Sequence, residues 1–317
     1  MTRGEPTYTV EHRHLATLPS GREIETPIHR YEAIAPGPTV YVQALQHGGE
    51  VNGAVVLRRL HRRLVKSNLS GTVLAVPVAN PLAVDHRRYT ISSRVDAVNT
   101  NMNRHWPGDS DGTVLQRIVA RLWDVAGESD VVVDIHTGGP EMLSHVRYTP
   151  GDDRSRELAE SFGLDYVVAE GTAKSSPESG NASGKLREIA SGNGIPCITP
   201  ELSHSRAIVE ESVESGVTGV ENVLKAVGVL DGEPDAGAPG VASEMEPVTA
   251  DKSGLFTPAV SVGDRVRVNQ SVGTVEDPGL WETRDTVRTP VGGLVLSISP
   301  GASVVEGERV ANVVDLV

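Results

Sequence analysis

Two short segments of the sequence place histidine and acidic side chains where they could share a divalent metal ion. His47 and Glu50 stand three residues apart in the segment QHGGEVNG, and His136 is followed by Thr-Gly-Gly. Two imidazoles and one carboxylate, with a fourth position left open, are the protein ligands of several hydrolytic zinc sites. The only cysteine is Cys197, which excludes a cysteine cluster as the metal site. We therefore expect one Zn²⁺ per chain, bound by the two histidines and Glu50.

Other residues have the chemistry that a metal hydrolase needs besides its metal. Zinc lowers the pKa of a bound water to about 7, and a further carboxylate must take the water proton and return it to the leaving amine. Glu201, in the segment PCITPEL, is the candidate general base. Asn103 and Arg104 adjoin in a predicted loop, where a planar guanidinium could bind a substrate carboxylate through two hydrogen bonds. Arg94 is a second catalytic candidate, which would polarise the scissile carbonyl.

Short apolar runs precede these residues and predict buried strands, with amphipathic helical patterns between them. The predicted strands are Thr39–Leu45, Thr72–Val78, Val131–Ile135, Tyr166–Ala169 and Pro196–Thr199, and the predicted helices are Asn52–Val65, Val114–Ala126 and Arg154–Phe162. Alternating strands and helices favour an α/β domain with a mixed, mostly parallel sheet flanked by helices. Ligand sites in such sheets lie beyond the carboxyl ends of the strands. His47, His136 and Glu201 each follow a predicted strand, so we expect them to meet there.

The composition changes after Leu230 and divides the chain into predicted domains. Residues 1–230 form the catalytic domain, 231–247 form a linker rich in Gly, Pro and acids, and 248–317 form a C-terminal β domain. The segments Gly254–Val275 and Gly293–Val314 are alike, which predicts a small all-β domain resembling a barrel-sandwich hybrid. Its hairpin WETRDTVR contains no lysine, so we do not expect it to carry a covalent cofactor. The polar stretch Gly171–Gly184 is predicted to be a mobile loop over the site.

The overall composition limits the classes of partner. Hydrophobic residues make up 38% of the 317 residues, which predicts a folded globular protein. The formal net charge of -13 disfavours binding to nucleic acid or to an anionic membrane. The chain has no apolar run long enough for a membrane span or a signal peptide, so we expect a soluble cytoplasmic protein. The expected partner is a small-molecule substrate, and whether the chain forms a homo-oligomer is left open.

The motifs, taken in order, resemble the succinylglutamate desuccinylase/aspartoacylase family of the zinc carboxypeptidase-like superfamily. The matching elements, over roughly residues 40–205, are His47-x-x-Glu50, Asn103-Arg104 with a following Pro-Gly, Asp134-Ile-His136 and Thr199-Pro-Glu201-Leu. The resemblance implies a zinc site at the two histidines and Glu50, a general base at Glu201 and a carboxylate-binding pair at Asn103 and Arg104. It also implies removal of an acyl group from an N-acyl amino acid or a related small amide.

The sequence departs from the family pattern at three points. Asn101-Met102 replaces the usual Asp-Leu, and the polarising arginine is either Arg94 or Arg88. The C-terminal domain of aspartoacylases contributes a tyrosine, and residues 248–317 contain none. We expect a zinc-dependent amidohydrolase acting as an N-acyl amino acid deacylase. The alternatives are a zinc carboxypeptidase acting on peptides and a non-catalytic small-molecule-binding protein.

Overall fold

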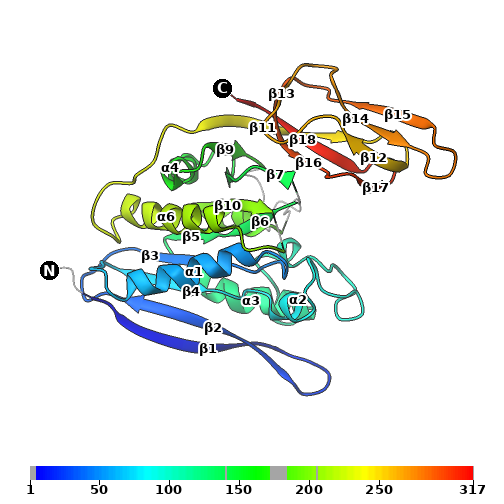
Figure 1. Ribbon diagram of the computed structural model, residues 1–317. Helices are drawn as coiled ribbons and strands as arrows, with labels where there is room; N and C mark the ends of the chain where they lie inside the picture. Colours follow the sequence, from blue (N-terminus) through cyan, green and yellow to red (C-terminus); the bar gives the residue numbers. More distant parts are fainter. Residues whose placement is uncertain (1–4, 140, 172–183, 205, 317) are drawn as a thin grey trace.

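The computed structural model describes residues 5–139, 141–171, 184–204 and 206–316, and shows a large mixed sheet between two layers of helices (Figure 1). The sheet runs in the order β1-β2-β4-β3-β5-β10-β8-β9-β11-β18-β16-β13, with β6 paired to β10 and β7 to β16. Its strands are β1 (Thr7–Thr17), β2 (Glu23–Glu32), β3 (Thr39–Gln43), β4 (Thr72–Val76), β5 (Val131–Asp134), β6 (His136–Gly138), β7 (Glu141–Met142), β8 (His145–Tyr148), β9 (Tyr166–Ala169), β10 (Cys197–His204), β11 (Gly240–Thr249), β13 (Arg265–Val266), β16 (Gly293–Ile298) and β18 (Arg309–Leu316). The strands β4, β3, β5 and β10 are mutually parallel and form the centre of the catalytic part.

Helices cover both faces of this central sheet. They are α1 (Val51–Leu64), α2 (Pro81–Asp85), α3 (Val114–Ala126), α4 (Asp153–Phe162), α5 (Leu186–Gly192), α6 (Glu210–Ala226) and the short 3-10 helix η1 (Met102–Arg104). Helices α1, α4 and α6 pack on one face, and α2, α3 and α5 pack on the other. Because both faces are covered, β3 and β5 have few polar positions, which is why they read as continuous apolar runs in the sequence.

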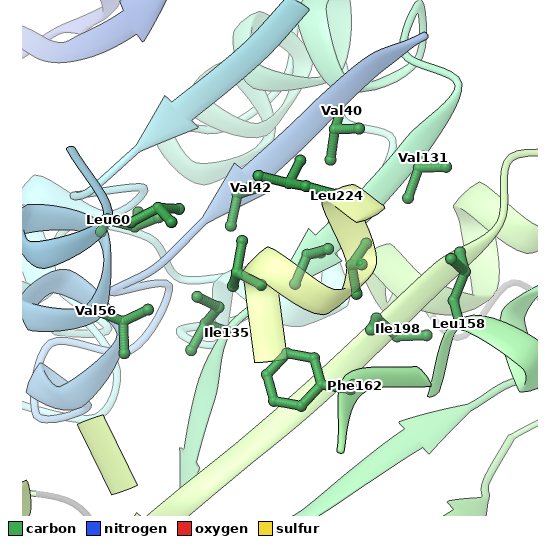
Figure 2. Packing of buried hydrophobic residues seen from close by; sticks show 14 of the residues in the cluster. Val40, Val42, Val56, Leu60, Val131, Ile135, Leu158, Phe162, Ile198 and Leu224 are labelled. Carbon is green, nitrogen blue, oxygen red and sulfur yellow. The ribbon is translucent and has the colours of Figure 1, made fainter. Parts of the chain in front are cut away.

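Strand β3 illustrates how the two cores are built. Val40 and Val42 point to the face covered by α1 and α6, where they meet Leu60 of α1 and Leu224 of α6 (Figure 2). Tyr41, between them, points to the opposite face of the sheet and packs in the core that α3 covers. All these side chains are buried. Burial of such aliphatic side chains stabilises the fold by about 1.5–3 kcal/mol each, so the strand is held rigidly where its carboxyl end enters the site.

The C-terminal residues form an all-β unit, as the sequence predicts. A second, antiparallel sheet has the order β15-β14-β12-β17, with the strands β12 (Gly254–Pro258), β14 (Ser271–Glu276), β15 (Thr283–Arg288) and β17 (Ala302–Val304). An apolar core joins it to β11, β16 and β18 and includes Phe256, Val275, Val295 and Val313. Strand β11 pairs with β9 of the catalytic part and with β18, so the main sheet continues into this unit. The predicted α/β fold with a small all-β C-terminal part is confirmed.

Some expectations differ from the observed elements. The hairpin β1–β2, an exposed edge of the sheet, is absent from the prediction, as is β8. The predicted linker at 231–247 contains no helix or strand up to residue 239, and its remaining residues belong to β11. The predicted mobile loop Gly171–Gly184 lies almost wholly outside the described residues. Within those residues, no helix is both long and apolar enough to cross a membrane.

Candidate metal-dependent active site

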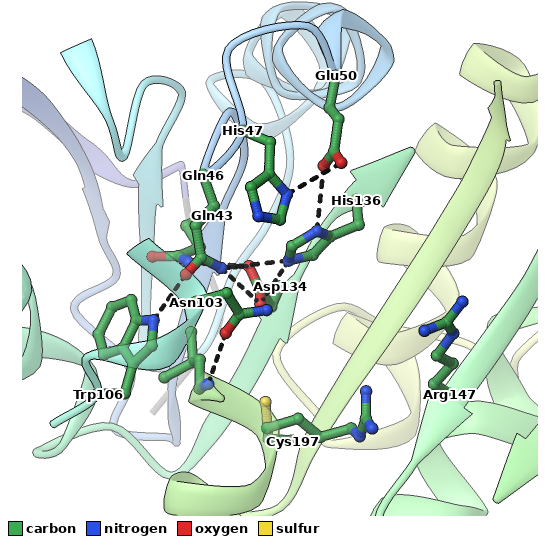
Figure 3. Close-up of polar contacts among 12 residues, drawn as sticks. Gln43, Gln46, His47, Glu50, Asn103, Trp106, Asp134, His136, Arg147 and Cys197 are labelled. Carbon is green, nitrogen blue, oxygen red and sulfur yellow. Dashed lines mark hydrogen bonds and ion pairs between the residues drawn. The ribbon is translucent and has the colours of Figure 1, made fainter. Parts of the chain in front are cut away.

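The structure brings His47, Glu50 and His136 together although they lie up to 89 residues apart in the chain, and each is buried. One ligand atom from each residue lies within 4.8 Å of the others. Nδ1 of His47 is 2.9 Å from Glu50 Oε1, and Nδ1 of His136 is 3.1 Å from Glu50 Oε2. Figure 3 shows both imidazoles directed at this carboxylate. The donors are nitrogen and oxygen atoms of the kind that zinc prefers, so the set fits a divalent metal ion.

The imidazole of His136 is oriented by Asp134, which lies on the side of the ring away from Glu50. His136 Nε2 lies 2.9 Å from Asp134 Oδ2, which leaves Nδ1 for the metal side. Gln43 and Gln46 donate to the same carboxylate from 2.8 and 3.1 Å (Figure 3). The Gln46 amide is in turn fixed by Trp106, whose Nε1 donates to Gln46 Oε1 at 2.7 Å. A carboxylate behind a ligating histidine sets the orientation of the ring and raises its basicity.

The electrostatics of the triad favour a charged carboxylate. Burial alone raises the pKa of Glu50, but the charges and hydrogen bonds of His47 and His136 outweigh burial and lower that pKa to about 2. Burial lowers the pKa of His136, whereas Asp134 and Glu50 raise it, and the net direction is well upward. The site therefore concentrates negative charge around two imidazoles, which is the environment that a divalent cation compensates.

Local chain geometry explains why the sequence QHGGE folds into this site. The loop after β3 passes so close to α2 that a Cβ on Gly48 would lie 2.1 Å from the carbonyl oxygen of Ala83, so only glycine fits. Glu50 is the residue before α1, and its side chain makes no cap bond to that helix because it is engaged with the histidines and with the backbone N–H of Thr137. The positive end of the helix dipole adds to the stabilisation of its negative charge.

Glu201 reaches the site through the pairing of β10. It lies within this strand, not after it as the sequence suggested, because the strand continues beyond Thr199 to pair with β6 and β8. Its register partner in β6 is His136, so the carboxylate is buried beside the metal ligands. Arg147 of β8 lies with one Nη 3.4 Å from Glu201 Oε1. Its other Nη is 3.1 Å from Glu170, so the guanidinium links two acids.

These residues surround a cavity of about 710 Å³. Its walls include metal ligands, the proposed base and four cationic or aromatic side chains, namely Glu50, His136, Glu201, Arg147, Arg206, Arg309 and Tyr89. The ring of Tyr89 stacks on His47 with centroids 3.9 Å apart. Partial burial of this half-exposed residue, followed by the charges of Glu50 and Glu201, raises the pKa of the phenol, which therefore stays protonated and can donate a hydrogen bond. At this volume, and with these polar walls, the cavity is large enough for a small polar molecule.

The remaining predicted residues, Asn103, Arg104, Arg94 and Arg88, are not among the residues that line this cavity. Asn103 of η1 accepts a hydrogen bond from the backbone of Leu186 at 3.0 Å, and the exposed Arg104 donates to the Asn103 carbonyl at 2.6 Å. Arg94 and Arg88 are exposed and are not among the residues that line the cavity. Their role in polarising a carbonyl stays a prediction.

Arg147, Arg206, Arg309 and Tyr89 were not singled out by the sequence. The only signal for Arg147 was its short spacing from His136, because strand β8 itself is too short and polar to stand out. Arg309 lies in β18 of the C-terminal unit, 173 positions beyond His136, and only the fold brings it to the cavity.

A buried site of two histidines and a glutamate, at the carboxyl ends of strands and open to a cavity with a further glutamate, defines a metal-dependent hydrolase. Residues 36–227 match the model of the succinylglutamate desuccinylase/aspartoacylase catalytic domain. The chain belongs to this family, and is a metal-dependent deacylase.

Individual relatives agree with this assignment. The chain is 32% identical over 262 residues to the N-alpha-acetyl-L-2,4-diaminobutyric acid deacetylase of Halomonas elongata, covering 76% of this chain and 71% of that one. A succinylglutamate desuccinylase/aspartoacylase structure from Rhodobacter sphaeroides superposes with a TM-score of 0.83 at 26% identity, covering 98% and 96% of the two chains. The product-bound ectoine utilization protein EutE (DoeB) from Ruegeria pomeroyi gives 0.82 at 21% identity, covering 98% and 99%, and shares the fold.

Proposed function

We propose that the protein is a zinc-dependent deacylase that hydrolyses the amide bond of a small N-acyl amino acid. The observation that carries the proposal is the buried His47–Glu50–His136 triad with Glu201 beside it on one cavity wall. The Halomonas relative, by its name, removes an acetyl group from an N-acetylated diamino acid. That activity supports the same reaction class for this chain.

The three triad residues would hold the zinc ion, with both histidines using Nδ1. When bound, zinc supplies a Lewis acid that lowers the pKa of water to about 7. Two nitrogens and a carboxylate leave room for a further ligand, as in hydrolytic rather than structural zinc sites.

Glu201 then acts as the general base. Its carboxylate takes the proton of the attacking water and delivers it to the departing amide nitrogen. Arg147, 3.4 Å from Glu201 Oε1, holds this carboxylate in place. Glu170 fixes Arg147 in turn. Burial lowers the pKa of Arg147, but the charges of Glu201 and Glu170 outweigh burial and raise that pKa above its ordinary value. Arg147 therefore remains a cation throughout the reaction.

Substrate orientation is assigned to the residues that the sequence predicts, although they are not among the residues that line the cavity in this structure. Asn103 and Arg104 bind a substrate carboxylate, and Arg94, with Arg88 as the alternative, polarises the carbonyl. Tyr89, stacked on His47, can donate a further hydrogen bond from its protonated phenol. Fixing the amide next to a metal and a base removes much of the entropic barrier to reaction.

The test is a panel of N-acetyl and N-succinyl amino acids, acylated diamino acids and short peptides, assayed with the zinc-loaded protein. We expect release of the amino acid from at least one N-acyl substrate and no release of C-terminal residues from peptides. Faster cleavage of the peptides would establish a carboxypeptidase instead.

The role of Glu201 is tested with Glu201→Gln, compared with Glu211→Gln at an exposed position of α6. We expect Glu201→Gln to keep its zinc and to lose activity by about 10²–10⁴-fold, and the control to match the wild type. Full activity in Glu201→Gln would show that this assignment is wrong, and a protein with neither zinc nor turnover would be the non-catalytic binder.

A further inference from the structure

Two arginines from distant parts of the chain lie on the wall of the catalytic cavity. Arg206 follows β10, and Arg309 begins β18 in the C-terminal unit. Within the part of the chain that the structure describes, neither guanidinium forms a side-chain hydrogen bond or ion pair. Arg147, by contrast, is bound by two acids.

The charge of the cavity wall makes these two cations significant. The acids among its lining residues are Glu50 and Glu201. Glu50 is bonded to both histidines, and Glu201 is paired with Arg147. Neither acid is therefore left to neutralise Arg206 or Arg309. Both arginines are exposed, and two guanidinium groups that line one cavity without an acid partner among the described residues form a site that attracts an anion.

The backbone holds both arginines on defined supports. The N–H of Arg206 donates to the carbonyl oxygen of Gly49 at 2.7 Å, which ties it to the loop that carries Glu50. A Cβ added at Gly49 would lie 3.4 Å from the Cγ of Arg206, so the side chain runs beside that loop. Arg309 stands opposite Thr249 in the β11–β18 pair, where the sheet fixes its Cα. One arginine thus projects from the segment after β10 that is tied to the metal-binding loop, and the other from a strand of the second unit.

We propose that Arg206 and Arg309 form a carboxylate subsite at the mouth of the cavity, separate from the predicted Asn103–Arg104 pair. This subsite rests on the proposed deacylase function and receives the end of the substrate that is remote from the scissile amide. The fork of a guanidinium matches a carboxylate through two parallel hydrogen bonds. The C-terminal unit, which lacks the tyrosine of aspartoacylases, then contributes to substrate selection through an arginine.

The second carboxylate could belong to the amino acid or to the acyl group, and two substrate pairs separate these sources. N-acetyl-L-glutamate against N-acetyl-L-glutamine places the charge on the amino acid. N-succinyl-L-alanine against N-butyryl-L-alanine places it on the acyl group. The kcat/KM of each is measured with zinc-loaded wild type, Arg206→Gln and Arg309→Gln. Arg265→Gln, in the C-terminal unit but away from the cavity, is the matched control.

For the pair that uses the subsite, we expect the wild type to prefer the charged member. Arg309→Gln should lower kcat/KM for that member by about tenfold or more, mainly through KM, and leave the neutral member within about twofold. Arg309→Lys should recover part of the loss, because it restores the charge without the fork. An unchanged preference in both glutamine variants would overturn the subsite.

A binding measurement separates the subsite from the proposed reaction. Titration calorimetry with glutarate tests whether the wild type binds a dicarboxylate at least about tenfold tighter than Arg309→Gln. Loss of binding in the variant supports the subsite even if no N-acyl amino acid is hydrolysed, in which case only the proposed function fails. Equal binding in wild type and variant contradicts the subsite.

Discussion

Replacing Asp134 by Asn tests whether the residues behind the metal ligands set the metal affinity. Asp134 is buried and accepts hydrogen bonds from Gln43, Gln46 and His136 at 2.8, 3.1 and 2.9 Å. Asparagine keeps the shape but turns one acceptor oxygen into a donor nitrogen. Wherever that nitrogen lies, it faces an N–H group, and His136 loses a charged acceptor.

The structure also sets the size of the effect. Loss of a partner of a ligating histidine costs about 10–100-fold in metal affinity. Gln43 can offset part of this loss by turning its amide over. In the wild type, the Tyr41 hydroxyl donates to Gln43 Oε1 at 2.9 Å. After the turn, Oε1 would accept from the new asparagine nitrogen, and the Tyr41 hydroxyl would accept from Gln43 Nε2. We therefore expect the lower end, about a tenfold rise in the zinc Kd, or ~1.4 kcal/mol.

The assay is competition for zinc against a chromophoric chelator at neutral pH. Asp130→Asn is the control, because Asp130 precedes the same strand and accepts from the backbone of Thr39 at 2.8 Å, away from the site. We expect the control to bind zinc as the wild type does. Wild-type affinity in Asp134→Asn, or an equal loss in the control, would refute the reasoning.

Two further predictions concern the frame of the site. Gly48→Ala places a methyl group 2.1 Å from the Ala83 carbonyl oxygen, so the loop that carries the metal ligands must shift. We expect this variant to have a lower melting temperature and weaker zinc binding than the control Gly139→Ala, where a Cβ meets nothing within 4 Å. Equal melting temperatures and zinc affinities of the two variants would show that the contact is unimportant. Burial raises the pKa of Glu170, but Arg147 and other cations outweigh it and hold that pKa well below its ordinary value of 4.5. The ionised form thus stabilises the fold above that value, and this contribution is lost as the pH falls below it. In metal-free protein, the free energy of unfolding should drop less steeply with acid in Glu170→Gln than in wild type, and parallel curves from chemical denaturation would contradict this.

Much of the catalytic fold follows from apolar patterning alone. The predicted helix Val114–Ala126 matches α3 in both bounds, and its start is fixed by a capping box between Thr113 and Gln116. Strand β3 ends two residues before the predicted Leu45, which has a φ of +54° because the chain turns there toward the metal loop. The hairpin β1–β2 was missed because its outer strand is polar and mostly exposed, so it has no apolar run.

The metal triad could be predicted from the sequence because its residues follow predicted parallel strands, and parallel strands end at one edge of a sheet. The cationic part of the cavity was not, since it depends on pairings between distant strands. Arg147 reaches Glu201 only because β8 pairs with β10 in an antiparallel register that sets Thr199 against Arg147. Arg309 reaches the cavity only because β11 extends the sheet into the C-terminal unit. Neither pairing leaves a mark in local composition.

The central claim is that one zinc ion is shared by three side chains. Crystals of the zinc-loaded protein, measured at the zinc absorption edge, test it directly through the anomalous difference map. We expect one strong peak per chain, within bonding distance of Nδ1 of His47, Nδ1 of His136 and the carboxylate of Glu50. A map with no peak at these three residues, or with its peak elsewhere in a protein that still hydrolyses N-acyl amino acids, would contradict the account.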